Sequence, residues 1–305
     1  MHELRHLQTD LLYIAFLECG DSSGWPCILC HGFPYDVECY RECIAPLVEA
    51  GAHVIVPFLR GYGPTTFRAK TVVRSGEQAA LAHDLLSLMD GLEIDHALLA
   101  GFDWGGRAAC IVSALWPERV TALVSGNSYN IQNIPESGEP KDPSIEAAYW
   151  YQYYFHSERG RRGLSENRQE LARLLWRQWS PDWSFADEVF EKTASSFDNP
   201  DFVEVVIHSY RHRFGLVAGD PHVAHIETRL IDQPEISVPT IAIDGETNGV
   251  SPTTAHHVSK FSGQYEYRVF AETGHNLPQE RPQLWVQAIL DAKKMAGVNS
   301  QTENR

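Results

Sequence analysis

The sequence predicts an α/β fold in which a mostly parallel sheet is covered by helices on both faces. Short apolar segments alternate with helical segments over the first 126 residues, and the alternation resumes after residue 237. This pattern is typical of parallel sheets, because each crossover between parallel strands needs room for a helix. Between the two parts lies a stretch rich in Tyr, Trp, Arg and Gln without a strong strand pattern. We therefore expect one α/β unit interrupted by a helical insertion.

The first part of the chain contains the predicted elements in a regular order. Strands are expected where apolar residues form short runs, as in Val54-Ile55-Val56, and helices where apolar residues recur on one side. The predicted strands are 4–8, 11–17, 27–30, 53–57, 96–100 and 120–124. The predicted helices are 40–50, 77–89 and 107–115.

The second part begins where the composition changes, at about Asn127, and the change lasts until about Pro234. Several helices are expected there. Strands are then expected at 238–243 and 265–270, followed by a turn at 274–276 and a closing helix at 282–295. The predicted division is an α/β core of residues 1–127 and 235–298, a helical cap of residues 128–234, and a disordered tail of residues 299–305.

Composition and charge exclude several classes of function. Hydrophobic residues make up 43% of the 305-residue chain, which is enough for a full core. The formal net charge of −15 argues against a nucleic-acid or anionic membrane partner. The first residues lack the apolar run of a signal peptide, and no segment has the roughly 18 consecutive apolar residues of a membrane helix. We expect a cytoplasmic protein whose partners are a small-molecule substrate and water, with a homodimer left open.

The cysteines do not predict a metal site or a disulfide. Six are present, and Cys27 and Cys30 match a C-x-x-C spacing. They lie in an apolar strand, where residues three apart face opposite sides and make an awkward clamp for a metal. We expect buried free thiols. Because no other metal-ligand spacing and no dinucleotide fingerprint is apparent, we expect no cofactor.

The segment Gly101-Phe102-Asp103-Trp104-Gly105-Gly106 has the pattern of a nucleophile elbow, with an apolar run before it and a helical pattern after it. Small residues at positions 101 and 105 allow a sharp turn that lifts the middle side chain into a pocket. A carboxylate at that place is a poor acyl nucleophile but can displace a leaving group at a saturated carbon, forming an ester. Epoxides or alkyl halides are the expected substrates. The alternative is that Asp103 only caps the following helix.

Four motifs, taken together, resemble those of the α/β-hydrolase-fold epoxide hydrolases, the Asp-nucleophile branch that is shared with haloalkane dehalogenases. The resemblance extends from about Leu11 to Met295. The matching segments are His31-Gly32-Phe33-Pro34 for the family's H-G-x-P loop, Gly101 to Gly105 for its G-x-D-x-G elbow, Tyr151 to Phe155 and Ser209-Tyr210-Arg211 for its two tyrosine-bearing cap segments, and Gly274-His275-Asn276 for its base loop.

The resemblance implies an α/β-hydrolase fold and a two-step reaction. Asp103 would attack an epoxide carbon while Tyr151 and Tyr210 donate protons to the opening ring. His275 would then activate a water molecule that hydrolyses the Asp103 ester. Tyr153 or Tyr154, in the same aromatic cluster, would be the alternative proton donors to Tyr151.

The resemblance also implies the surroundings of the reacting groups. The backbone N–H groups of Phe33 and Trp104 would form the oxyanion hole. His31 would be a structural member of the loop, and Pro34 would fix its bend, with a cis peptide bond as one way to do so. An apolar or aryl epoxide is the expected substrate. The expected substrate-binding residues are His31, Pro34, Trp104, Trp150, Tyr153 and Tyr154.

One position departs from the family's pattern. The carboxylate that usually orients the base would be expected after the strand at 238–243, and spacing from Gly245 places Asn248 there. An amide can orient an imidazole, but it does not stabilise an imidazolium by charge. Glu246 or Asp244 could reach across the loop instead.

Two other functions remain open from the sequence. A haloalkane or haloacid dehalogenase would use the same Asp103 and His275, with the indole N–H groups of Trp104 and Trp150 as halide donors. A weakly active binding protein would keep the fold without turnover, and Asn248 is the residue that favours it. The paired tyrosines favour the epoxide, because a departing halide needs no acid.

Overall fold

The computed structural model describes residues 3–185, 187–250 and 253–302, and its centre is a nine-stranded sheet. The strand order is β1-β2-β4-β3-β6-β7-β8-β9, with β5 paired to β2. The strands are β1 Glu3–Gln8, β2 Leu12–Cys19, β3 Trp25–Cys30, β4 Ala52–Pro57, β5 Thr66–Phe67, β6 Ala97–Phe102, β7 Val120–Gly126, β8 Thr240–Gly245 and β9 Tyr265–Phe270.

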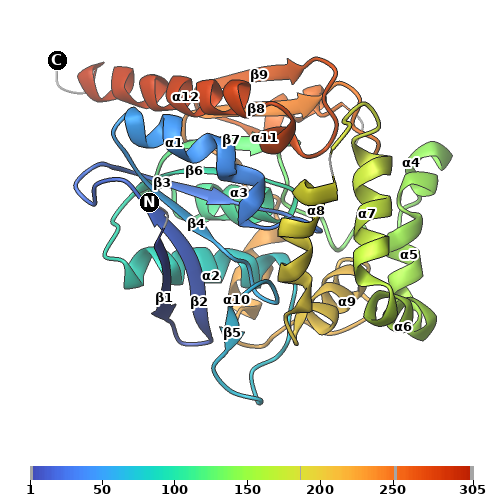
Figure 1. Ribbon diagram of the computed structural model, residues 1–305. Helices are drawn as coiled ribbons and strands as arrows, with labels where there is room; N and C mark the ends of the chain where they lie inside the picture. The colour runs from blue at the N-terminus through green and yellow to red at the C-terminus, as the bar shows by residue number, and fades with distance from the viewer. Residues whose placement is uncertain (1–2, 186, 251–252, 303–305) are drawn as a thin grey trace.

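The sheet is parallel from β4 to β9, whereas β1, β2 and β5 pair antiparallel at one edge. Every residue of β4, β6 and β8 is buried, because helices cover both faces of the sheet. Helices α1 (Arg41–Glu49) and α12 (Pro282–Thr302) lie on one face, and α2 (Gln78–Gly91) lies on the other (Figure 1). The predicted α/β fold with a mostly parallel sheet is confirmed.

The inserted segment, residues 128–234, is helical between β7 and β8. Among the residues that the structure describes there, none is in a strand. Figure 1 shows α4 to α7 gathered at one side of the molecule, beyond the sheet. The helices are α4 Pro143–Ala148, α5 Trp150–His156, α6 Glu158–Glu166, α7 Arg168–Trp179, α8 Asp187–Ala194, α9 Phe202–His212 and α10 Ala224–Leu230.

The remaining helices include two whose extent differs from the prediction. Helix α3 (Asp103–Leu115) begins at Asp103 rather than at residue 107, and α12 continues to Thr302 rather than ending at 295. Residues 299–302 of the expected disordered tail are therefore helical, and residues 303–305 lie outside the described residues. The short elements are η1 Val37–Tyr40, η2 Pro117–Arg119, η3 Ser195–Asp198, η4 Ala255–Lys260 and α11 Leu277–Glu280.

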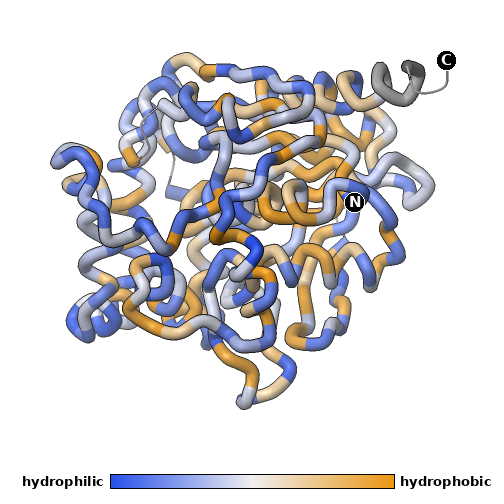
Figure 2. The backbone as a smooth tube through the Cα atoms, turned by 180° about the vertical axis from the view of Figure 1, so that it is seen from behind, coloured by the Kyte–Doolittle hydropathy of each residue, from blue (hydrophilic) through white to orange (hydrophobic). Residues whose placement is uncertain are grey.

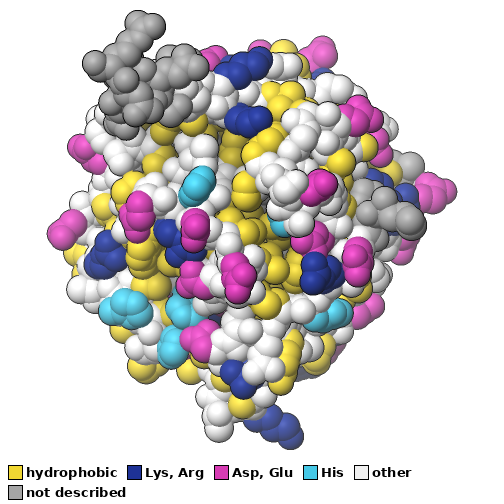
Figure 3. All heavy atoms as spheres, turned by 90° about the vertical axis from the view of Figure 1, so that its left-hand side faces the viewer, with side chains coloured by type: hydrophobic (Ala, Val, Ile, Leu, Met, Phe, Trp, Pro, Cys, Tyr) yellow, Lys and Arg dark blue, Asp and Glu magenta, His cyan; other side chains and the backbone are white. Residues whose placement is uncertain are grey.

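Apolar residues concentrate in the central strands, and hydrophilic residues dominate the outer loops and helices (Figure 2). Figure 3 shows acidic side chains interspersed with basic ones on one face, in keeping with the net charge of −15. All six cysteines are buried. Of the described helices, none is both long and apolar enough to cross a membrane.

A buried carboxylate joins the inserted segment to the loop after β3. The side chain of Asp36 accepts hydrogen bonds from Thr193 Oγ1 (2.8 Å) and Ser196 Oγ (2.6 Å), which lie at the end of α8 and in η3. It also accepts the N–H of Glu38 (3.0 Å). Burial raises the pKa of Asp36 to about 7, because removal from water disfavours the charged form.

We expect Asp36→Ala to lower the free energy of unfolding by about 2–4 kcal/mol, because two buried hydroxyl groups and a backbone N–H lose their acceptor. Urea unfolding measures the effect. The matched control is Glu188→Ala on the exposed side of α8, which should change stability by less than about 0.5 kcal/mol. Equal stability of the two variants would show that this contact does not hold the inserted segment.

Candidate active site

The turn from β6 into α3 places Asp103 at the carboxyl end of the parallel strands, where ligands bind in open α/β sheets. The backbone of Asp103 has a φ of 51°, which a non-glycine residue rarely adopts. A Cβ atom on Gly105 would lie 2.0 Å from the carbonyl oxygen of Cys30, and one on Gly101 would lie 2.7 Å from the carbonyl carbon of Gly105. Only glycine allows strand β3, strand β6 and helix α3 to approach this closely.

The loop after β3 wraps around the Asp103 carboxylate. The N–H of Phe33 donates to Asp103 Oδ1 at 2.8 Å, and a Cβ atom on Gly32 would lie 2.5 Å from the Cβ of Asp103. The bond between Phe33 and Pro34 is cis. The Trp104 ring is fully buried and stacks on the Phe33 ring with centroids 5.7 Å apart. The buried Nε1 of Trp104 has no hydrogen-bond partner among the described residues.

Asp103 is surrounded by protein yet remains 12% exposed. Burial alone would raise its pKa, but the nearby His275 ring, the charge of Arg107 and the N–H of Phe33 together lower the pKa of Asp103 to about 2. The side chain is therefore a carboxylate at neutral pH. An ionised carboxylate held in a solvent-reachable position is what a nucleophile requires.

His275 lies between Asp103 and Asn248. Its Nε2 is 3.7 Å from Asp103 Oδ2, and its Nδ1 is 3.2 Å from the amide Nδ2 of Asn248. Asn248 Oδ1 accepts the N–H of Val250 at 3.1 Å, which directs the Nδ2 of the amide toward the ring. Because an amide nitrogen can only donate, His275 Nδ1 is the acceptor and the ring proton is on Nε2.

The two carboxylates that the sequence offered as alternatives point elsewhere. Asp244 accepts the N–H of Thr254 (2.6 Å) and the hydroxyl of Tyr267 (2.7 Å). Glu246 accepts the N–H of Glu272 at 3.0 Å. The structure thus brings Asn248, and neither of these acids, to the imidazole.

Glu280 lies beneath the loop that holds His275, and the sequence analysis did not identify it. Its carboxylate accepts the N–H groups of Gly274 (2.7 Å) and Asn276 (2.9 Å), as well as the hydroxyl of Ser180 (2.6 Å). Burial raises the pKa of Glu280. The His275 N–H in turn donates to Ser180 Oγ and to the carbonyl oxygen of Trp179, both at 3.1 Å. The end of α7 therefore helps to hold the loop of the proposed base.

Tyr151 and Tyr210 come from α5 and α9 and meet above the Phe33 ring. Their ring centroids are 5.3 Å apart, and each is within 6.5 Å of the Phe33 centroid. Both are buried, which raises the pKa of each phenol well above 10. The hydroxyl oxygen of Tyr151 accepts a hydrogen bond from Gln152 Nε2 at 3.0 Å, which leaves its own proton free to be donated.

Two predicted pocket residues of α5 lie outside this cluster. Tyr153 is 38% exposed and contacts Glu146, because residues two apart on a helix face different sides. Tyr154 packs against Trp150, and its hydroxyl lies against Gly163 in α6. Neither tyrosine contacts Phe33 or Tyr210 through a ring contact, in contrast to Tyr151.

Three other predicted residues have their polar atoms engaged with protein groups. The Trp150 indole N–H donates to Gln178 Oε1 at 3.1 Å.

His31 is buried, with Nδ1 3.0 Å from the oxygen of Gly32, and its Nε2 accepts the N–H of Leu59. Burial lowers the pKa of His31 to about 4, so the ring is neutral. The carbonyl of Pro34 accepts the indole N–H of Trp176 at 2.8 Å. Because these polar atoms of Trp150, His31 and Pro34 already bind protein groups, they are suited to structural roles and not to polar contacts with a ligand.

Two arginines near Asp103 are absent from the sequence prediction. Arg107 follows Asp103 by one helical turn, so the two side chains share a face of α3. The Cζ of Arg213 lies 4.2 Å from the centroid of the Tyr210 ring. Its Nη1 donates to Gln152 Oε1 at 3.3 Å. The spacing within α3 is a signal that could have identified Arg107, whereas Arg213 is brought in only by the fold.

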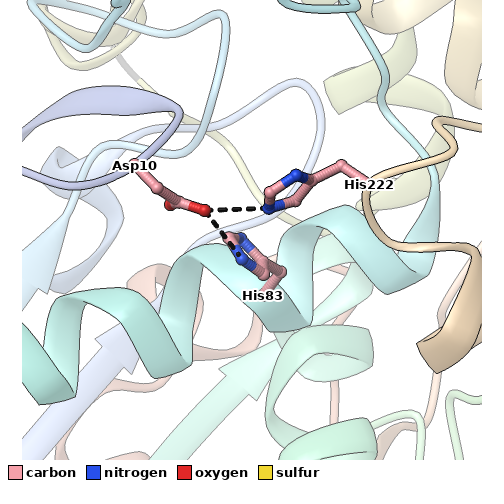
Figure 4. Close-up of side chains that lie close together, drawn as sticks. All are labelled: Asp10, His83 and His222. Carbon is pink, nitrogen blue, oxygen red and sulfur yellow. Dashed lines mark hydrogen bonds and ion pairs between the residues drawn. The ribbon is translucent and has the colours of Figure 1, made fainter.

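One group of side chains away from the Asp103 segments could hold a metal ion (Figure 4). Asp10 lies in the turn between β1 and β2, His83 on α2, and His222 just before α10. Asp10 Oδ2 is 2.8 Å from His222 Nε2 and 3.3 Å from His83 Nε2. Two imidazoles and a carboxylate are a donor set that suits Zn²⁺. These three residues lie far apart along the chain, so no local spacing in the sequence points to them as metal ligands.

Comparison with known proteins places this geometry in a family. A family model described as the alpha/beta hydrolase fold matches residues 26–282. The chain belongs to the alpha/beta hydrolase fold family. A solved structure from Klebsiella pneumoniae named a "putative epoxide hydrolase" is 44% identical, with a TM-score of 0.94, and the match covers 96% of this chain and 97% of that one.

Curated relatives of this alpha/beta hydrolase fold chain carry epoxide hydrolase names. Bifunctional epoxide hydrolase 2 of Sus scrofa is 29% identical over 178 residues, which are 58% of this chain and 30% of that protein. Epoxide hydrolase A of Mycobacterium tuberculosis is 25% identical over 151 residues, which are 50% of this chain and 45% of that protein. The matches thus span less than half of the length of these two relatives. The resemblance seen in the sequence is confirmed.

Proposed function

We propose that this chain is an epoxide hydrolase that opens an epoxide to a vicinal diol through a covalent ester on Asp103. The observation that carries the proposal is the pair of buried phenols, Tyr151 and Tyr210, beside an ionised Asp103. An opening epoxide develops an alkoxide, which needs a proton donor, whereas a departing halide does not. The names of the relatives support the same activity. Residues 128–234 would act as the cap that supplies both phenols.

In the first step, one carboxylate oxygen of Asp103 forms a bond to an epoxide carbon as the C–O bond of the ring breaks. The N–H of Phe33 holds the carboxylate by its Oδ1. Tyr151 and Tyr210 donate hydrogen bonds to the ring oxygen, and one of them transfers a proton to it. Their raised pKa values keep both phenols protonated at neutral pH.

In the second step, His275 takes a proton from water on Nε2, which requires the ring proton to lie on Nδ1 and the amide of Asn248 to turn its oxygen toward it, and the resulting hydroxide attacks the carbonyl carbon of the ester. The backbone N–H groups of Phe33 and Trp104 would stabilise the oxyanion of the tetrahedral intermediate. Asn248 would orient the ring of His275, and Glu280 would hold the loop in place through its backbone. Collapse of the intermediate releases the diol and restores the Asp103 carboxylate, and the proton taken by His275 returns to the tyrosinate left by the first step.

A dehalogenase with the same Asp103 and His275 is the second candidate function. One observation favours it: the buried Nε1 of Trp104, next to the nucleophile, has no hydrogen-bond partner among the described residues and could bind a halide. The second donor expected from the sequence, Trp150, donates its indole N–H to Gln178.

We expect Tyr151→Phe and Tyr210→Phe each to lower kcat for styrene oxide on the order of 10²-fold, because the alkoxide loses a proton donor. Release of 1-phenyl-1,2-ethanediol measures the rate. Tyr153→Phe on the exposed side of α5 is the matched control and should retain the rate of the unaltered protein. If both variants retain that rate, or if the protein releases halide from chloroalkanes but no diol from epoxides, the epoxide hydrolase proposal fails.

A further inference from the structure

Two guanidinium groups beside the proposed reaction centre, that of the partly buried Arg107 and that of the buried Arg213, form no ion pair with a carboxylate of the described residues. The Nε of Arg107 is buried without a hydrogen-bond partner among the described residues. Arg213 is 8% exposed, and its Nε and Nη2 are also buried without a partner. Its hydrogen bond from Nη1 goes to a neutral amide, that of Gln152. Burying a charge without a partner costs free energy, so a ligand that supplies the partner is a physical reason for the arrangement.

The local charges do not cancel. Asp103 contributes one negative charge, whereas Arg107 and Arg213 contribute two positive charges, which leaves an excess of one positive charge in a protein whose formal net charge is −15. Burial and the nearby charge of Arg213 lower the pKa of Arg107 to about 10, as expected for a cation that lacks compensation. One further negative charge would balance the group.

Nearby acidic side chains already have other partners. Glu280 accepts the hydrogen bonds of the His275 loop. Glu146, in α4, accepts the N–H of Lys141 and contacts Tyr153. The groups that face Arg213 from α5 and α9 are the phenols of Tyr149, Tyr151 and Tyr210, all neutral at pH 7 because burial raises the pKa of each.

We propose that Arg107 and Arg213 bind a carboxylate group of the substrate, so that the chain acts preferentially on epoxy acids. This inference rests on the proposed function. Arg107 is one helical turn from Asp103, a separation of roughly 5–6 Å between Cβ atoms. A carboxylate held there would therefore lie within a few bonds of the epoxide carbon that Asp103 attacks. The planar fork of a guanidinium matches a carboxylate, and a single negative charge matches the single excess positive charge.

The kinetic test compares two epoxides that differ in one charge, trans-3-phenylglycidate and trans-3-phenylglycidamide. We expect kcat/KM for the carboxylate to exceed that for the amide by about 10-fold or more in the unaltered protein. The ratio of the two kcat/KM values should fall by about 10-fold or more in Arg107→Met and in Arg213→Met. The matched control is Arg162→Met, an arginine of α6 whose side chain is 77% exposed, and it should leave the ratio unchanged.

A binding measurement separates this inference from the proposed function. Calorimetry with 3-phenylpropionate and 3-phenylpropionamide, which carry no epoxide, should show tighter binding of the carboxylate and loss of that advantage in Arg107→Met. If the protein binds the carboxylate selectively but forms no diol from any epoxide, the carboxylate site is supported and the proposed function is wrong. If the protein hydrolyses trans-3-phenylglycidate and trans-3-phenylglycidamide equally well, and neither arginine substitution changes this, the carboxylate inference is wrong while the proposed function stands. Tighter binding of 2-phenylethylphosphonate than of 3-phenylpropionate would overturn the assignment to a carboxylate.

Discussion

Asp103→Asn should abolish both covalent capture and hydrolysis of an aryl epoxide. In the unaltered protein, intact-mass measurement after rapid mixing with styrene oxide should show an adduct that carries the whole mass of the epoxide. The amide of the variant is neutral and a far weaker nucleophile, so the adduct should be undetectable and diol release should fall by on the order of 10³-fold or more. Diol release is followed in the same samples.

The exposed Asp182 provides the matched control for this experiment. Asp182→Asn makes the same chemical change in the inserted segment and should retain the adduct and the diol. An adduct that still forms in Asp103→Asn would assign the nucleophile to another residue. Diol release that persists without any adduct in Asp103→Asn would instead support direct attack by water, and the ester mechanism would be wrong.

Asn248→Asp should speed the hydrolytic step by on the order of 10²-fold or more. In the structure, the amide of Asn248 donates to Nδ1 of His275, which keeps the ring proton on Nε2, the atom that would accept a proton from water in the proposed second step. A carboxylate at position 248 would accept a hydrogen bond from Nδ1–H and stabilise the imidazolium. The unaltered protein should therefore accumulate the ester on Asp103, and the variant should not. Decay of the adduct mass in a single turnover measures this step.

The control for this prediction is Glu246→Gln, which removes a carboxylate from the same loop. Because Glu246 accepts the N–H of Glu272 and does not reach His275, the decay of the adduct should be unchanged. If Asn248→Asp has no effect or slows the decay, Asn248 does not limit the orientation of the base. If Glu246→Gln slows the decay of the adduct, Glu246 rather than Asn248 orients the ring of His275.

The strands of the fold were predictable because buried strands of a parallel sheet are continuous apolar runs. The run at 96–100 corresponds to the fully buried β6 at Ala97–Phe102, whereas the segment 265–270, which coincides with the edge strand β9, alternates between apolar and charged residues. The start of α3 was predicted late, since Gly105 and Gly106 suggest a turn. In the structure they are helical: the missing side chain of Gly105 allows α3 to pack closely on β3, and that of Gly106 leaves room for Asn130. Local propensity cannot reveal such a packing requirement.

The candidate site was predictable where its parts are contiguous in sequence. The elbow around Asp103 and the loop around His275 each carry a recognisable local pattern, and the structure brings them within 3.7 Å. Glu280 and Arg213 have no local pattern, because their roles arise from contacts between segments that meet only in the fold. Tyr153 was grouped with Tyr151 because both belong to the same aromatic stretch of the sequence. The helical repeat alone puts Tyr151 and Phe155 on one face and Tyr153 on another.

The carbonyl of Trp179 and the hydroxyl of Ser180 fix the backbone of His275, although they lie in the inserted segment and His275 lies in the α/β core. A Cβ atom on Gly274 would lie 2.3 Å from the Cα of Ser180, so the two backbones are in direct contact. The inserted segment and the loop of the proposed base are therefore not independent modules. A chimera that receives residues 128–234 from another alpha/beta hydrolase would therefore also exchange the two groups that hold the backbone of His275 in place.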